Sequence, residues 1–273
     1  MTPYPNLISE SLLINETVSL LRSFGGKASA VSVVDFVMKI RKPDQRLARM
    51  LVRDLIERDP RLSLNIDMVE LADDEFESRE LAETGFVVFD LETTGAKAPP
   101  CRITEIGAYR VKNGEVTDEF QTLVNPEMPI PRFITELTGI SDDMVAGAPV
   151  FADVAEDFLN FIGDSILVAH NSGFDMRFLN HEISRVFGDY KMANPCLCTV
   201  QLSRKLLPNI LNHKLKTVAE HYSIDLVNHH RASADAYATA HIFVNLLAKL
   251  EKKGINDLAA VRKMGSRKHG YVR

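Results

Sequence analysis

A run of four apolar residues, FVVF at positions 86–89, constrains the fold of this chain more than any other feature. A strand without polar alternation is expected to be covered on both faces, as in the centre of an α/β sheet. Two acids follow at once, Asp90 and Glu92, and their spacing of two directs both side chains to one face. The sequence therefore predicts a buried central strand that ends in a pair of carboxylates.

Strand and helix patterns alternate after this run. Residues 102–111 and 115–124 are expected to form two strands joined by an Asn-Gly turn. A buried strand is expected at residues 165–169 and a short one near Cys196. Helices are predicted over residues 132–138, 150–162, 174–187, 199–206, 214–222 and 234–251. This order indicates a mixed α/β sheet with flanking helices.

Residues 1–72 show a different pattern and are expected to form a small separate domain. Three helices and then a hairpin are predicted there, over residues 12–24, 30–38, 44–58 and 62–64 with 68–71. The third helix has Asp44 as its expected N-cap, and Leu47, Leu51 and Leu55 form an apolar stripe along it. This order of elements predicts a winged-helix-like domain.

Composition sets the remaining boundaries. Residues 73–85 hold six acids and one base, which is typical of a linker, and residues 86–251 follow as the main domain. Residues 252–273 are expected to be a basic C-terminal tail. Three cysteines favour a reducing compartment over a disulfide framework, and no apolar run is long enough to span a membrane. A cytoplasmic protein without membrane contact is therefore expected.

Two further acids fall near helix starts. Asp175 lies in the first turn of the helix after the 165–169 strand, and Asp235 lies in the first turn of the last helix, with Ser233 as its expected N-cap. Taken singly, such acids are usually caps or solvated turns. Found together, they place carboxylates from separate elements at the sheet edge where α/β proteins build their sites.

The charge of the chain supports a cation site. The net charge is −5, and residues 86–261 hold 16 Lys and Arg against 22 Asp and Glu. An acidic pocket repels phosphate unless cations fill it first, and hard cations such as Mg²⁺ prefer carboxylate oxygens. The acidic middle of the chain is therefore compatible with a phosphate substrate only if metal ions bind there.

Three blocks of the sequence resemble the signature motifs of the DEDDh (DnaQ-like) exonucleases, the superfamily of the bacterial DNA polymerase III epsilon proofreading subunit, RNase T and oligoribonuclease. They are FDLETTG at 89–95, AHNSGFD at 169–175 and HRASADA at 230–236. The resemblance extends over about residues 86–250. It implies an RNase H-like fold built on a mixed five-stranded sheet with flanking helices.

The resemblance also assigns roles to residues. It implies two divalent ions, Mg²⁺ or Mn²⁺, bound by four acids, with a histidine as the general base. His229 and His230 are adjacent, and the family places its histidine five residues before the last aspartate, which selects His230 and leaves His229 as an exposed neighbour. The implied catalytic residues are Asp90, Glu92, Asp175, His230 and Asp235.

Substrate contacts are expected from four residues. Thr93 and Thr94 follow the first acids and are placed to hold the terminal nucleotide, and Thr138 is a weaker candidate of the same kind. Phe174 could stack on a base, although an apolar residue beside a helix start is more often part of the core. The expected partners are 3′ ends of single-stranded DNA or RNA.

The third N-terminal helix carries Arg46, Arg49 and Arg53 on one face. Such a face could contact the phosphates of a duplex. It could equally be a solvated face of an accessory domain that plays no part in substrate binding.

The resemblance implies a metal-dependent 3′→5′ exonuclease that releases nucleoside 5′-monophosphates, with DNA favoured over RNA. A free-standing enzyme of DNA repair or end trimming is expected, because only about twenty residues follow the last predicted helix. A polymerase partner would be expected to need a longer extension. Proofreading within a DNA polymerase, RNA trimming and a non-catalytic nucleic-acid-binding module are the alternatives.

Overall fold

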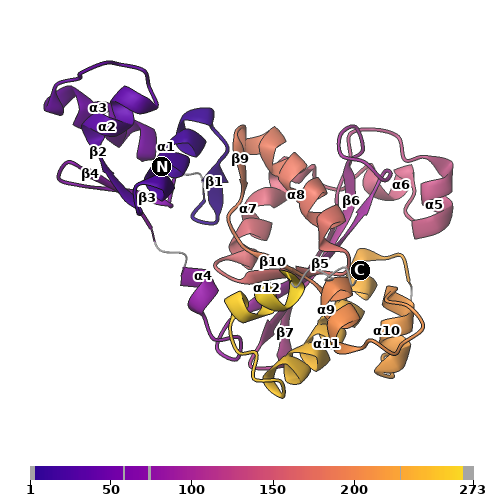
Figure 1. Cartoon of the computed structure of the whole chain (residues 1–273). Coiled ribbons are helices and arrows are strands. Elements are labelled where there is room, and N and C mark those ends of the chain that lie inside the picture. Colours follow the sequence, from indigo (N-terminus) through magenta and orange to yellow (C-terminus); the bar gives the residue numbers. More distant parts are fainter. Residues whose placement is uncertain (1–3, 58, 73–74, 228, 267–273) are drawn as a thin grey trace, which may run out of the picture. The chain divides into compact units, whose positions relative to one another are not determined.

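The computed structural model describes residues 4–57, 59–72, 75–227 and 229–266. The chain divides into two compact units (Figure 1). One consists of Met1–Asp74 and Ile183–Ala193, and the other of Glu75–Glu182 and Asn194–Arg273. Among the described residues, no helix combines the length and the apolar character needed to cross a membrane.

The N-terminal unit contains three helices and a small antiparallel sheet with the strand order β2-β4-β3. Its third helix begins as predicted, because Asp44 Oδ1 accepts the Leu47 N–H at 2.9 Å. The most buried face of that helix is formed by Ala48, Val52 and Ile56, and the leucine stripe lies beside this face. Its elements are β1 (Leu7–Ser9), α1 (Leu12–Ser23), β2 (Lys27–Ser29), α2 (Ala30–Phe36), α3 (Gln45–Ile56), β3 (Leu62–Asn65) and β4 (Met68–Leu71).

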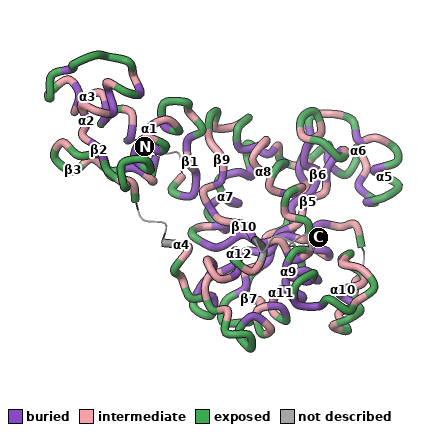
Figure 2. The backbone as a smooth tube through the Cα atoms, viewed as in Figure 1, coloured by how far each residue is buried: buried purple, intermediate pink, exposed green. Residues whose placement is uncertain are grey.

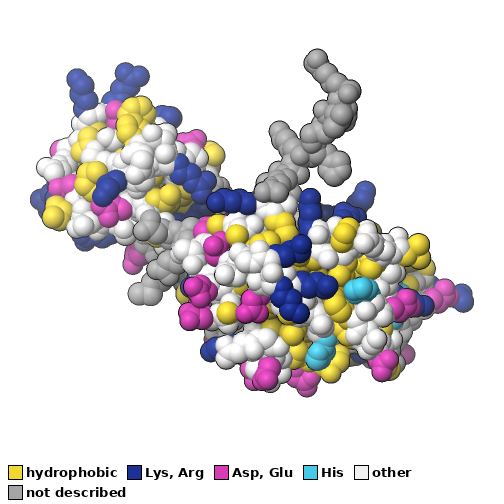
Figure 3. All heavy atoms as spheres, turned by 60° about the horizontal axis from the view of Figure 1, so that its bottom comes forward, with side chains coloured by type: hydrophobic (Ala, Val, Ile, Leu, Met, Phe, Trp, Pro, Cys, Tyr) yellow, Lys and Arg dark blue, Asp and Glu magenta, His cyan; other side chains and the backbone are white. Residues whose placement is uncertain are grey.

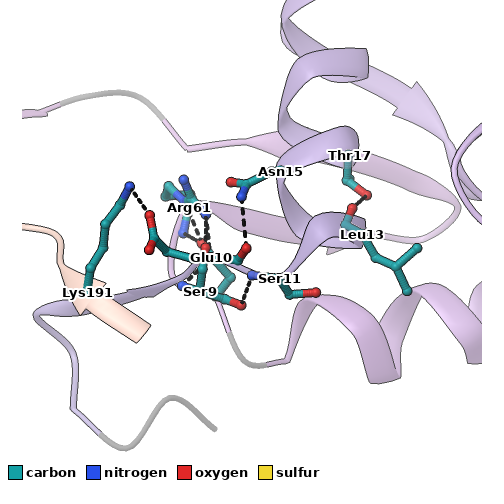
Figure 4. A network of polar contacts seen from close by, with 9 residues as sticks. Ser9, Glu10, Ser11, Leu13, Asn15, Thr17, Arg61 and Lys191 are labelled. Carbon is teal, nitrogen blue, oxygen red and sulfur yellow. Dashed lines mark hydrogen bonds and ion pairs between the residues drawn. The ribbon is translucent and has the colours of Figure 1, made fainter. Parts of the chain in front are cut away.

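A pairing between distant segments closes this unit. Strand β1 runs antiparallel to β9 (Tyr190–Met192), and Lys191 Nζ lies 2.6 Å from Glu10 Oε1 (Figure 4). Asp59 accepts four hydrogen bonds, from the Ser9 N–H and from three nitrogens of Arg61. Arg61 Nη2 also donates to the Ser9 carbonyl at 3.0 Å. Nothing in the local sequence pattern predicts this pairing, because both strands are three residues long.

The larger unit is built on a mixed five-stranded sheet with the order β10-β8-β5-β6-β7. Strands β5, β6 and β7 form an antiparallel run, whereas β8 is parallel to β5 and β10 is parallel to β8. This is the sheet type predicted from the sequence. The strands are β5 (Phe86–Thr93), β6 (Ile103–Lys112), β7 (Glu115–Leu123), β8 (Ile166–Ala169) and β10 (Cys196–Cys198).

Helices cover both faces of this sheet, which explains the continuous apolar run at the start of β5. On one face Phe86 packs edge-on against Phe243, with ring centroids 4.9 Å apart. On the other, Phe158 lies between Phe89 and Phe120. Strands β5, β6 and β8 are accordingly buried, whereas the edge strand β7 is largely exposed (Figure 2). The helices are α4 (Glu75–Ser78), α5 (Arg132–Thr138), α6 (Asp142–Val145), α7 (Phe151–Ile162), α8 (Ser172–Phe187), α9 (Thr199–Leu206), α10 (Leu215–His221), α11 (Ala232–Glu251) and α12 (Leu258–Ser266).

Two segments expected to lack structure contain short helices. The expected linker, residues 73–85, includes α4, although residues 73 and 74 lie outside the described part of the chain. The expected tail includes α12, whose Leu258 and Val261 are buried in the core. The division into a domain, a linker, a main domain and a tail stays a prediction.

Candidate active site

Asp90 and Glu92 lie on the same face of β5, as their spacing predicts. Across the antiparallel ladder, Asp90 pairs with Gly107 of β6 and Glu92 pairs with Glu105. Gly107 is where the start of α11 crosses the sheet, since a Cβ there would lie 2.3 Å from the backbone nitrogen of Ser233. The missing side chain therefore lets the beginning of α11 rest directly on the strand beside the two acids.

This contact brings a third acid to the first two. Carboxylate oxygens of Asp90, Glu92 and Asp235 lie within 4.8 Å of one another, and Asp235 is in the first turn of α11. Asp175 comes from the first turn of α8 and is buried. It is close enough for its charge to raise the pKa of Asp90, although it is not in the group of three. The four predicted acids thus converge from three elements.

Asp90 and Glu92 are half-buried, Asp175 and Asp235 are buried, and little positive charge lies beside the four acids. Burial, and then the charges of Asp175 and Glu92, raise the pKa of Asp90 well above its usual value. Burial and the charge of Asp235 raise the pKa of Glu92 to about 8, and Arg231 opposes this rise. Burial raises the pKa of Asp175 to about 7, against backbone hydrogen bonds that lower it. Carboxylates in this state repel one another when charged, and a divalent cation is the group that would relieve them.

Both adjacent histidines lie at the cluster. His229 Nδ1 is 2.8 Å from Asp235 Oδ1, and its ring stacks on that of His230 with centroids 3.9 Å apart. The backbone N–H of His230 donates to Asp235 Oδ2 at 3.2 Å. Within the described chain, no hydrogen bond reaches a ring nitrogen of His230, and burial and His229 lower its pKa. His229 is exposed, as expected, but its contact with Asp235 was not anticipated.

Glu105 and Arg231 are site-adjacent residues that sequence reasoning missed. Glu105 is fully buried, and it accepts hydrogen bonds from Arg231 Nη2 at 2.7 Å and from the backbone N–H of Ala232 at 2.9 Å. The expected N-cap, Ser233, is wrong: α11 begins at Ala232, and Ser233 Oγ lies 3.0 Å from the Tyr109 hydroxyl. The available signal was the E-x-G spacing of Glu105 and Gly107, which repeats the two-residue period of the acids on β5.

The residues predicted to contact the substrate already make contacts within the protein. Thr93 Oγ1 donates to the Gly95 carbonyl at 2.7 Å, and Thr94 Oγ1 accepts from the Arg102 N–H at 3.0 Å. The Thr138 hydroxyl donates to the Ile134 carbonyl of its own helix. Phe174 is half-buried, and its ring centroid lies 4.8 Å from that of Phe178. All three threonine hydroxyls thus have hydrogen-bond partners within the protein. A role for Thr93, Thr94, Thr138 and Phe174 in substrate binding stays a prediction.

A second buried ion pair fixes the loop after Thr94. Arg102 donates to Glu182 of α8 through Nε at 2.5 Å and through Nη2 at 3.1 Å. The Thr94 N–H donates to the Arg102 carbonyl at 2.8 Å, so this loop is held at both ends. Arg102 therefore links the segment that follows the first two acids to the helix that carries Asp175.

A mixed five-stranded sheet that gathers four carboxylates at one edge defines the class: a nuclease of RNase H-like fold, for which divalent metal ions are typical. Residues 87–243, more than half of the chain, match the RNase T family of exonucleases, and the chain belongs to that family. The resemblance inferred from the three sequence blocks is thereby confirmed at the level of the family.

Known proteins similar to the chain include DNA polymerases. It is 46% identical over 180 residues to the PolC-type DNA polymerase III of Oceanobacillus iheyensis, and 45% identical over 177 residues to that of Bacillus subtilis. These matches cover 66% and 65% of the chain, which spans 12% of the length of each relative. Among solved structures, exonuclease X in complex with 5′-overhanging duplex DNA is 27% identical, with a TM-score of 0.51 over 62% of this chain and 93% of that one.

Proposed function

We propose that this protein is a metal-dependent 3′→5′ exonuclease of the DEDDh type, which releases nucleoside 5′-monophosphates from DNA ends. The convergence of Asp90, Glu92 and Asp235 within 4.8 Å carries the proposal. A cluster of like charges that is partly removed from solvent destabilises a fold, so it needs a functional reason. Asp175 beside this cluster and His230 before α11 complete the residue set that the family motif implies.

The four acids fit divalent cations by their chemistry. Carboxylate oxygens are the ligands that Mg²⁺ and Mn²⁺ prefer, and no Lys or Arg forms an ion pair with Asp90, Glu92 or Asp175 in the described chain. We assign Asp90, Glu92 and Asp235 as ligands, with Asp175 as the fourth. Two such ions would supply an activated water and stabilise charge on the phosphate and the leaving oxygen.

His230 is proposed as the general base. Its lowered pKa keeps the ring neutral near pH 7, so that a ring nitrogen can accept a proton from water. His229 suits this role less well, because its Nδ1 is bound to Asp235. We propose that His229 instead orients Asp235, and that the backbone N–H of His230 does the same from the other side.

The choice of DNA rests on the relatives. The two similar relatives are DNA polymerases, and the structure of exonuclease X was determined in complex with duplex DNA. Thr93 and Thr94 are proposed to contact the terminal nucleotide through backbone groups, since their hydroxyls have internal partners. Phe174 and Thr138 remain candidates for further substrate contacts.

A release assay tests the function. The protein is incubated with 3′-labelled and 5′-labelled single-stranded DNA and RNA, with Mg²⁺, Mn²⁺ or EDTA. We expect mononucleotides from the 3′ end of DNA, faster than from RNA, and no release in EDTA. Activity that survives EDTA, or that starts at the 5′ end, would disprove the proposal.

Two histidine variants sharpen the same assay. His230→Ala should lower kcat at least about 100-fold, which is the scale of general base catalysis. His229→Ala is the matched control from the adjacent position, and we expect it to retain more activity while binding metal more weakly. If His229→Ala lost more activity than His230→Ala, the two roles would be reversed.

The biological context has two candidates. We propose a free-standing enzyme of DNA repair or end trimming, working in the cytoplasm. Proofreading beside a polymerase is the second candidate, favoured by the 45–46% identity to PolC-type polymerases. Primer templates with paired and mismatched 3′ ends separate them: a proofreader prefers the mismatch and accelerates when polymerase is added, whereas a free-standing enzyme shows no dependence on the polymerase.

The N-terminal unit is proposed to be a winged-helix-like domain that contacts duplex DNA. Its order of elements supports this fold, and Arg46 and Arg53 of α3 are exposed. Arg49 is less available, since it binds Asp67 of the hairpin at 2.7 Å. Figure 3 shows Lys and Arg side chains beside hydrophobic ones and a few acids on the visible face of this unit. Arg46→Glu with Arg53→Glu should weaken duplex binding in a filter assay, and unchanged binding would leave the unit an accessory domain.

A further inference from the structure

The first residues of β6 hold the start of the helix that carries Asp235. Glu105 is fully buried, and its two oxygens accept four hydrogen bonds from the segment before and at the start of α11. Three come from the guanidinium of Arg231, at 2.7 to 3.3 Å, and one comes from the backbone N–H of Ala232. One side chain of the sheet therefore binds two consecutive residues of this turn.

Glu105 replaces the local cap that α11 lacks. The residue at the N-cap position is Arg231, whose side chain makes no capping hydrogen bond. The first N–H groups of a helix need acceptors, and a carboxylate is favoured there by the helix dipole. Because the acceptor comes from a strand 126 residues away in the chain, the start of the helix is fixed to the sheet and not only to its own turn.

This turn places two of the proposed functional groups. His230 precedes Arg231 and has a φ of 70°, a left-handed conformation that costs a non-glycine residue about 1–2 kcal/mol. Such a conformation persists only where neighbouring contacts hold it. Asp235 lies four residues after Arg231, and its backbone N–H donates to the Arg231 carbonyl at 3.0 Å. A displacement of the backbone at Arg231 would therefore move both His230 and Asp235.

Gly107 sets a second constraint on the same turn. The backbone at Ala232 and Ser233 lies against Gly107, where even a Cβ would collide. Gly107 fixes how closely α11 approaches the sheet, and Glu105, two residues earlier on the same face, fixes its rotation and its position along the strand. Both residues are cross-strand partners of acids on β5, so one register places all of these groups.

We infer that Glu105 is a positioning residue: paired with Arg231, it holds the turn that orients His230 and Asp235. This inference rests on the proposed exonuclease function. Glu105 is expected to act on the reaction without touching the substrate, because its oxygens are occupied by Arg231 and Ala232. Its removal should therefore lower kcat and weaken metal binding more than it changes KM.

The test compares Glu105→Gln, Arg231→Lys and the double variant with the parent protein. Glu115→Gln, an exposed glutamate at the start of β7, is the matched control and should equal the parent. We expect Glu105→Gln to lower kcat 10- to 100-fold with KM within about threefold, and to weaken Mn²⁺ binding in titration calorimetry several-fold. Arg231→Lys keeps the charge but loses the two-pronged contact, so a smaller loss is expected.

The double variant identifies the pair as a unit. If Glu105 acts through Arg231, the two losses are non-additive, and the double variant resembles Glu105→Gln alone. Additive losses, or a parent-like kcat and Mn²⁺ affinity in Glu105→Gln, would overturn the inference. Should Glu105→Gln fail to fold by circular dichroism, a parent-like Arg231→Lys would overturn it as well. A parent protein that binds Mn²⁺ but releases no nucleotide would refute the proposed function instead, and the Mn²⁺ titrations of the variants would still test Glu105.

Discussion

Buried acids are treated in opposite ways in the two units. In the N-terminal unit Asp59 is almost completely buried, and it accepts four hydrogen bonds, three of them from Arg61. In the exonuclease unit Asp90 is half-buried beside Glu92, Asp175 and Asp235, and burial and the charges of neighbouring acids raise its pKa. Among the described residues, no side-chain hydrogen bond or ion pair reaches Asp90.

The difference in hydrogen bonding distinguishes an acid with a structural role from an acid with a functional one. A buried carboxylate with all its oxygens bound stabilises the segments that it joins, here the start of the chain and the beginning of β3. A buried carboxylate without donors costs free energy and is retained where it binds something absent from the folded chain itself. The same residue type therefore predicts opposite consequences of substitution in the two units.

The largest expected effect is on activity at Asp90. Asp90→Asn should lower kcat at least about 1000-fold if Asp90 is the proposed metal ligand, because losing such a ligand removes several kcal/mol of transition-state stabilisation and 1.36 kcal/mol is tenfold in rate. The metal-free variant should unfold at a higher temperature than the parent at pH 8, since the carboxyl that is disfavoured by burial and by the neighbouring acids is removed. Nucleotide release and thermal unfolding in EDTA measure the two effects. An active variant, or a less stable one, would contradict the contrast with Asp59.

Asp59→Asn is expected to lower stability and to leave activity unchanged. Breaking a buried ion pair from one side typically costs about 3 kcal/mol, so we expect a clear loss in the free energy of unfolding of the N-terminal unit. The kcat for single-stranded DNA should stay near the parent value, because Asp59 belongs to the other unit. Denaturant unfolding gives the first quantity, and Asp54→Asn, an exposed aspartate of α3, is the control. If Asp59→Asn and Asp54→Asn were equally stable, the structural role of Asp59 would be disproved.

A third consequence is that the stability of the metal-free protein depends on pH. The raised pKa of Glu92, from 4.5 to about 8, means that the folded state binds more protons than the unfolded chain between these values. Stability without metal should therefore fall as pH rises from about 5 to 8. Bound Mg²⁺ competes with these protons, so its stabilising effect should be larger at pH 8 than at pH 6. Thermal unfolding with EDTA and with Mg²⁺ checks both signs, and a metal-free protein that gains stability over this range would contradict them.

The acids could be located from the sequence because their positions follow from local rules. Two-residue spacing on a buried strand put Asp90 and Glu92 on one face, and helix starts located Asp175 and Asp235. The order of these blocks then matched a family whose fold the structure shares. Local periodicity is sufficient where the strand and the helices are long.

Contacts between distant segments could not be read in the same way. Ser233 looked like a cap because caps are usually local, whereas the acceptor for α11 is Glu105. An acid near the start of an apolar strand, such as Glu105, gives no sign of its partner, and neither does the short β1 that pairs with β9. The helix α12 was missed because its basic residues suggested a tail, although Leu258 and Val261 are apolar positions three apart. Each of these features depends on contacts between segments that are distant in the chain, and the local sequence pattern does not specify such contacts.

The close approach at Gly107 also has a consequence for the order of assembly. Asp90 and Glu92 belong to a hairpin of neighbouring strands, whereas Asp235 arrives only when α11 settles on Gly107, long after those strands in the chain. Until that contact forms, Asp235 is not held beside Asp90 and Glu92, and the three acids cannot share an ion. A partly folded or newly made chain therefore has no assembled cluster of acids, and the proposed nuclease activity is acquired together with the completed core.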